Sequence, residues 1–172
     1  MARKIDKAVF DTGPFIHLNE IDLLRILKLF KSIMVVDEVF NELNKNADLH
    51  TKIKNARNIK LLQLKPQSKD MSKLLVEKYN IGLAESSSIS LSMQEKADVF
   101  ITDDLEARTT AKNFGLEVHG TVGVIVRAFR EGIIPKDMAI SKIRELYEKS
   151  SLFITKDLAD FAVKEIRGYR MG

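Results

Sequence analysis

Short apolar runs alternate along this chain with longer segments whose apolar residues recur at helical spacing. The apolar runs have the length and composition of buried strands, and they lie at residues 8–10, 33–36, 59–64, 99–101 and 116–119. The segments between the runs place apolar residues three and four positions apart, which predicts amphipathic helices. This alternation predicts one α/β domain around a mainly parallel sheet.

Gly, Pro and small polar residues predict where these elements begin and end. After the first run, Gly13 and Pro14 are expected to stop the strand in a turn, with a helix beginning near Phe15. Asp37 is a credible N-cap for the helix after the second strand. Pro66 is expected to end the third strand, so that Ser68 or Asp70 caps the next helix. Pro135 fits the first position of a later helix.

Length and composition fit one soluble domain. The chain has 172 residues, of which 45% are hydrophobic and 30% charged, and it has no cysteine. We expect a single domain over 1–172, with a core of about 1–130 and a C-terminal helical extension over 135–172. No signal-peptide pattern and no apolar run of roughly 18–20 residues is present, so we expect a cytoplasmic protein without a membrane partner. The net charge of +4 is only a weak indication of nucleic-acid binding.

The candidate chemistry lies in acids that follow apolar runs. Asp11 follows the first run, and the adjacent Asp103 and Asp104 follow a later one. Parallel neighbouring strands would bring these carboxylates to one edge of the sheet, where ligands bind in open α/β folds. Glu42 and Glu85 lie near the starts of helices and are able to reach the same edge. Carboxylates that cluster repel each other unless a hard cation is bound, and oxygen ligands suit Mg²⁺.

Each acid also has an ordinary structural interpretation. Asp11 before Thr-Gly-Pro is typical of a turn or cap residue, and Asp103 or Asp104 is a natural helix N-cap. Glu42 alone would be surface charge, and Glu85 alone would be a first-turn acid favoured by the helix dipole. The metal interpretation therefore depends on the four positions taken together.

Four short motifs in order resemble the PIN-domain family, the metal-dependent ribonucleases that include toxins of prokaryotic toxin–antitoxin pairs. The motifs are Asp11-Thr12, Val39-Phe40-Asn41-Glu42-Leu43, Gly82-Leu83-Ala84-Glu85 and Thr102-Asp103-Asp104. The resemblance implies a three-layer α/β/α sandwich with an acidic pocket for Mg²⁺ or Mn²⁺. The turn at 120–123 and the segment at 153–158 resemble a little-characterised prokaryotic branch of that family.

By position, the resemblance implies a catalytic and metal-binding quartet of Asp11, Glu42, Glu85 and Asp104. Asp103 stays open as an alternative ligand to its neighbour. Thr12 and Thr102 are expected to hydrogen-bond to ligands or substrate from behind the site, and possible RNA contacts are Arg108, Lys112, Arg127 and Arg130. For these four cations a solvated helix face is an equally good interpretation.

Two features of the sequence bear on activity. Position 85 is glutamate where many family members have aspartate. The branch that the chain most resembles often lacks the first aspartate, whereas Asp11 is present here, which favours an active enzyme.

Three functions remain as hypotheses. The first is a divalent-metal-dependent endoribonuclease acting on RNA, with a small antitoxin and a second copy of the chain as candidate partners. The second is a non-catalytic RNA- or protein-binding module on the same fold. A receiver-like or phosphatase-like phosphotransfer protein is a distant third, because Asp11-Thr12-Gly13 lacks the second acid of Asp-x-Asp.

Overall fold

The computed structural model describes residues 5–170, and its centre is a sheet of five parallel strands. The strand order is β3-β2-β1-β4-β5, and every neighbouring pair is parallel. The strands are β1 (Lys7–Phe10), β2 (Ser32–Val35), β3 (Ile59–Leu61), β4 (Val99–Ile101) and β5 (Val118–His119). The predicted α/β sandwich with a parallel sheet is confirmed.

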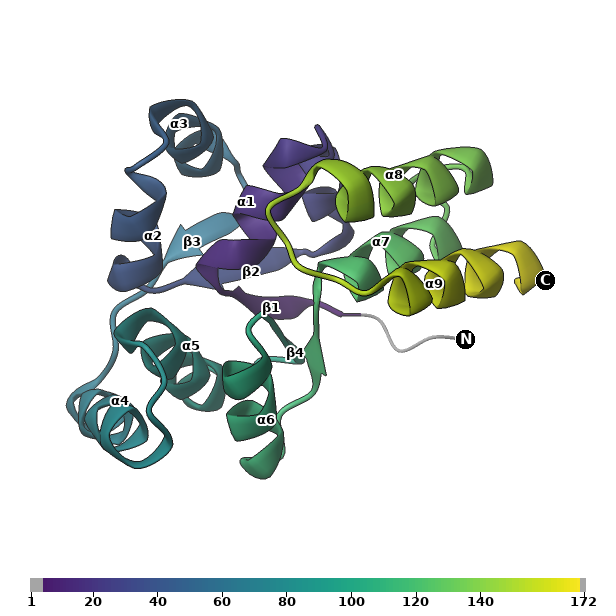
Figure 1. Ribbon diagram of the computed structural model, residues 1–172. Helices are drawn as coiled ribbons and strands as arrows, with labels where there is room; N and C mark the ends of the chain where they lie inside the picture. The colour runs from purple at the N-terminus through teal and green to yellow at the C-terminus, as the bar shows by residue number, and fades with distance from the viewer. Residues whose placement is uncertain (1–4, 171–172) are drawn as a thin grey trace.

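Helices cover both faces of the sheet, as parallel crossovers require. Figure 1 shows α1, α7, α8 and α9 on one side and α4, α5 and α6 on the other. The helices are α1 (Thr12–Glu20), the 3₁₀ helix η1 (Leu24–Leu29), α2 (Asp37–Leu43), α3 (Ala47–Asn55), α4 (Pro66–Tyr79), α5 (Leu83–Gln94), α6 (Leu105–Asn113), α7 (Thr121–Arg130), α8 (Lys136–Lys149) and α9 (Lys156–Gly168).

The middle of the core is aromatic. Phe10 at the end of β1 is fully buried, and its ring lies 5.0 Å from that of Phe15 and 5.2 Å from that of Phe30. Phe15 belongs to α1, and Phe30 follows η1. These contacts hold α1 against the sheet, directly behind the point where β1 ends.

Two prolines open helices instead of separating elements. Pro14 lies in the first turn of α1, which begins at Thr12, so no turn intervenes between β1 and the helix. Pro66 is the first residue of α4, and neither Ser68 nor Asp70 caps that helix. Proline is tolerated in a first turn because its missing N–H has no partner there, and its fixed φ suits the helix.

Two other helix starts differ from prediction by one residue. Asp37 is the first residue of α2, with Val36 as N-cap. Pro135 is the N-cap of α8 and not its first residue. Both proposed helices exist, and only the position of the cap was wrong. Among residues 5–170, no helix combines the length and apolar character that crossing a membrane would need.

Candidate functional site

The strand order brings Asp11 and Asp104 to neighbouring strand ends. β1 pairs with β2 on one side and with β4 on the other. Strands β2 and β3 are added outward on one side of β1, and β4 and β5 on the other, so the order of strand addition switches sides between β1 and β4. The backbone N–H of Asp11 donates to the carbonyl of Ile101, the last residue of β4, at 2.9 Å. In open parallel sheets this reversal point opens a crevice at the carboxyl edge, where ligands bind.

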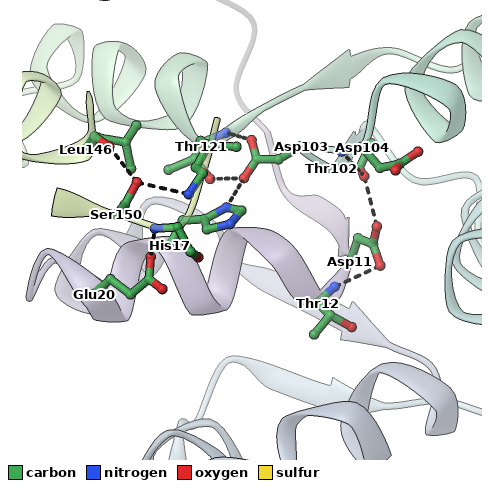
Figure 2. Close-up of polar contacts among 12 residues, drawn as sticks. Asp11, Thr12, His17, Glu20, Thr102, Asp103, Asp104, Thr121, Leu146 and Ser150 are labelled. Carbon is green, nitrogen blue, oxygen red and sulfur yellow. Dashed lines mark hydrogen bonds and ion pairs between the residues drawn. The ribbon is translucent and has the colours of Figure 1, made fainter. Parts of the chain in front are cut away.

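Asp11 is a buried carboxylate whose hydrogen bonds come only from neutral groups. Its side chain is 4% exposed and caps α1, with Oδ1 accepting from the N–H of Thr12 at 2.8 Å. Its Oδ2 accepts from the hydroxyl of Thr102 at 2.9 Å (Figure 2). No lysine, arginine or histidine among residues 5–170 pairs with it. Burying an unpaired carboxylate is costly, so this position needs a further explanation.

The pKa of Asp11 shows what surrounds it. Burial is the main cause that raises this pKa from 3.8 to about 7, and the negative charges of Glu85 and Glu42 raise it further. The hydrogen bonds from Thr12 and Thr102 lower it but do not cancel these effects. The charges of Glu42 on α2 and Glu85 on α5 are therefore felt at Asp11.

Glu42 and Glu85 line this space from two helices. Glu42 on α2 is exposed, and its Oε2 accepts from the hydroxyl of Thr12 at 2.5 Å. Glu85 lies in the first turn of α5 and is half-buried, and burial together with Glu42 and Asp104 raises its pKa. Its carboxylate folds back against Gly82, where a Cβ would collide with Oε2.

Asp104 is tied to Asp11 through a shared hydroxyl. It is the N-cap of α6, with Oδ1 accepting from the N–H of Ala107 at 2.7 Å. Its own N–H donates to the Thr102 hydroxyl at 3.2 Å, and that hydroxyl in turn donates to Asp11. Thr102 is fully buried. Its hydroxyl therefore links the carboxylate of Asp11 to the backbone of Asp104.

Asp103 points in the opposite direction from Asp104 (Figure 2). Its Oδ2 lies 2.6 Å from Nδ1 of His17 and accepts from the Thr121 hydroxyl at 2.5 Å. Its Oδ1 accepts from the N–H of Thr121 at 2.7 Å. Asp103 thus joins α1, the end of β4 and the start of α7, and both of its oxygens are occupied. Of the two adjacent acids, Asp104 is the one whose negative charge raises the pKa of Glu85.

The contacts of Asp103 with His17 and Thr121 could not be predicted from the sequence. His17 and Asp103 are 86 positions apart, and no motif links them. His17 lies one to two turns after Asp11 on α1, on the side that faces α7. Thr121 was noted only as part of a glycine-rich turn. The sheet topology brings these three residues together, and no pattern in the sequence predicts their contact.

A hard divalent cation suits the donor set of this edge. Asp11, Glu42, Glu85 and Asp104 supply only carboxylate oxygens, which Mg²⁺ and Mn²⁺ prefer. As the side chains lie, no group of three or more acids or histidines within residues 5–170 is close enough to hold a metal ion. Glu42 and Glu85 are turned instead toward Thr12 and Gly82. The unpaired, buried Asp11 is the observation that a cation would explain.

The four cations proposed as RNA contacts are divided between α6 and α7. Arg108 is turned inward, where its guanidinium donates to the carbonyl of Thr102 at 3.3 Å and lies against Gly120. Arg127 pairs with Glu131 at 2.7 Å on α7. Arg130 pairs with Glu165 at 3.1 Å and lies over the ring of Tyr169. Lys112 is exposed on α6. Each arginine thus has a protein partner, and an RNA contact by any of the four cations stays a prediction.

The fold is that of an open α/β protein, with Asp11 and Asp104 following neighbouring strands at its topological switch point. A family model described as a PIN domain matches residues 7–167. The chain therefore belongs to the PIN-domain family. A comparison with curated proteins gave no significant match.

Proposed function

We propose that this protein is a divalent-metal-dependent endoribonuclease that hydrolyses RNA phosphodiesters. The observation that carries the proposal is Asp11, a carboxylate that is 4% exposed, lacks a cationic partner in residues 5–170, and has Glu85 and Glu42 beside it. Burying such a carboxylate lowers the stability of the folded protein, and a cation bound to it would offset that loss. Membership of a family with a nuclease-like fold supports this choice of chemistry.

Asp11 and Asp104 would hold the ion, and Glu42 and Glu85 would complete the pocket or position water. A bound Mg²⁺ or Mn²⁺ would activate a water molecule and neutralise charge that develops on the phosphate. The Thr102 hydroxyl fixes the direction of the Asp11 carboxylate through its 2.9 Å hydrogen bond. Thr12 holds Glu42 close to the same edge. These hydroxyls orient the acids from behind, as outer partners do in metal sites.

More specifically, we propose that the ribonuclease is a toxin that a small antitoxin protein binds. We expect it to be a homodimer in the cytoplasm. The support for this proposal is the resemblance of the four motifs to toxin-like members of the family. Exposed aromatic side chains near the C-terminus, Phe153 and Phe161, provide apolar surface for a protein partner.

The experiment that tests the nuclease proposal is cleavage of a mixed-sequence single-stranded RNA by the purified protein. We expect cleavage in Mn²⁺ or Mg²⁺, and no cleavage in EDTA. Restoring the ion should restore the activity. Cleavage that continues in EDTA would contradict the dependence on metal.

A non-catalytic RNA-binding module is the second candidate, because Glu42 and Glu85 are turned away from a finished metal site. The same experiment separates the two functions. RNA that is retained by the protein but stays intact in Mn²⁺ would favour the binding module.

A further inference from the structure

A cavity lies beside the acids, beyond the ends of β2 and β3. Its volume is about 300 Å³, and it is bounded by α2, α4 and α5. Its apolar walls are Val36, Leu62, Leu64 and Leu83, and its polar groups include Glu38, Ser72, Ser87, Lys69 and Lys73. Apolar walls with a few convergent polar groups are the usual composition of a site for a small planar ligand.

Two of the helices that line this cavity, α2 and α5, also carry two of the four acids, Glu42 and Glu85. Glu38 and Glu42 are one turn apart on α2, so one helix serves both places. Leu83, which lines the cavity, and Glu85 lie two residues apart in the first turn of α5, on different faces of that helix. β2 also lies directly beside β1 in the sheet. An extended RNA strand following the carboxyl edge would therefore pass from the acids over the cavity.

The floor of the cavity holds the carboxylate of Glu38 in place. Ser87 is buried, and its hydroxyl donates to Oε1 of Glu38 at 3.2 Å. Ser72 is also buried and lies 3.1 Å from the Ser87 oxygen, so these hydroxyls form a connected chain. Within residues 5–170, no hydrogen bond is made to the other carboxylate oxygen of Glu38. That oxygen is an acceptor at the wall of the cavity without a protein donor.

Two lysines line the same cavity from α4. Lys69 and Lys73 are four residues apart, which places them on one face of the helix. Both are exposed, and neither has an ion pair with any acid in the part of the chain that the structure describes. In contrast, the arginines of α7 are paired with Glu131 and Glu165. The lysines are therefore the cations that are available to a phosphate next to this cavity.

We propose that the cavity binds a nucleobase of the RNA substrate, and that it selects guanine. The choice follows from Glu38, because a carboxylate only accepts hydrogen bonds, and guanine alone among the bases presents two adjacent donors, its N1–H and its exocyclic amino group. Adenine would place the N1 lone pair against this carboxylate. Lys69 and Lys73 contact the phosphate that flanks the base. The role of the cavity as a substrate site rests on the proposed ribonuclease function.

Mononucleotide binding in EDTA tests this site without using metal or cleavage. We expect the protein to bind 5′-GMP roughly tenfold more tightly than 5′-AMP, the difference made by one or two hydrogen bonds. Inosine 5′-monophosphate lacks the exocyclic amino group and should fall between them. Glu38→Gln should remove the preference for GMP over AMP. Glu148→Gln, an exposed acid on α8, is the matched control and should keep it.

The lysines are tested separately from the base. Lys73→Ala should weaken 5′-GMP binding and leave guanosine binding unchanged, because guanosine has no phosphate. Lys164→Ala on α9 is the control for loss of an exposed lysine.

This site would be overturned by equal binding of GMP and AMP by the wild-type protein, or by an unchanged GMP preference in Glu38→Gln. Absence of GMP binding at millimolar concentration would also overturn it. None of these results bears on the metal-dependent cleavage of RNA, which is measured with the ion present. A protein that binds GMP selectively but fails to cleave RNA would retain the cavity and lose the nuclease function.

Discussion

Replacing Asp11 by asparagine is expected to lower the rate of RNA cleavage by roughly a hundredfold to a thousandfold, the loss typical of removing one electrostatic group at a reacting centre. Asparagine has nearly the same shape as aspartate, and its side chain is able to keep contacts with Thr12 and Thr102. What it loses is the negative charge that would hold the cation. The measurement is the initial rate of cleavage of one RNA in Mn²⁺ by the wild-type and Asp11→Asn proteins.

The control for this variant is Glu148→Gln, which removes an exposed acid on the other side of the sheet from α5. Circular dichroism of each variant should match that of the wild-type protein, which excludes misfolding. Cleavage at the wild-type rate by Asp11→Asn would remove Asp11 from the site and leave its burial without an explanation.

The same substitution is expected to stabilise the metal-free protein at alkaline pH. The pKa of Asp11 is raised mainly by burial, from 3.8 to about 7, so the folded protein binds this proton more tightly than the unfolded chain does. The stability that protonated Asp11 contributes is fully present below about pH 4 and is lost as the pH rises through 7. A shift of about three pKa units corresponds to roughly 4 kcal/mol. Asparagine does not ionise, so the Asp11→Asn protein does not lose this stability as the pH rises.

Urea unfolding in EDTA at pH 5 and pH 8 measures the effect. The free energy of unfolding of Asp11→Asn, relative to that of the wild-type protein, should increase by roughly 2–3 kcal/mol between the two pH values. Taking this difference cancels the other groups that titrate equally in both proteins. The same difference at pH 5 and pH 8 would mean that Asp11 ionises normally in the folded protein.

The repeated pattern of an apolar run followed by acids was enough to predict the centre of this fold. Each apolar run is short and wholly apolar, which is typical of a buried strand. In the structure, the strands that precede Asp11 and Thr102-Asp103-Asp104 are parallel neighbours. The negative charges of Glu42 and Glu85 raise the pKa of Asp11, so the three acids influence one another. Their assignment as metal ligands stays a prediction.

Local signals gave wrong boundaries where one residue type serves two purposes. Gly13 and Pro14 are typical of turns, but proline is equally suited to the first turn of a helix, and α1 uses it there. The choice between the two depends on Phe15 packing against Phe10, a tertiary contact.

The division of work between Asp103 and Asp104 also depends on distant residues. Both acids lie past the end of β4, and Asp103 faces α7 whereas Asp104 caps α6. This difference is set by His17 and Thr121, which bind Asp103, and neither lies near the two acids in sequence. In the same way, the cavity beside the site is formed by three helices and two strand ends, so its lysines had no signature in the sequence.

A calorimetric titration with Mn²⁺ at pH 7.5 tests the four-carboxylate site most directly. We predict that the wild-type protein and Glu148→Gln bind Mn²⁺ with a dissociation constant in the millimolar range or tighter, and that Asp11→Asn binds it at least about tenfold more weakly. Equal Mn²⁺ binding by wild-type and Asp11→Asn proteins, or no binding by the wild-type protein, would contradict a metal site built around Asp11.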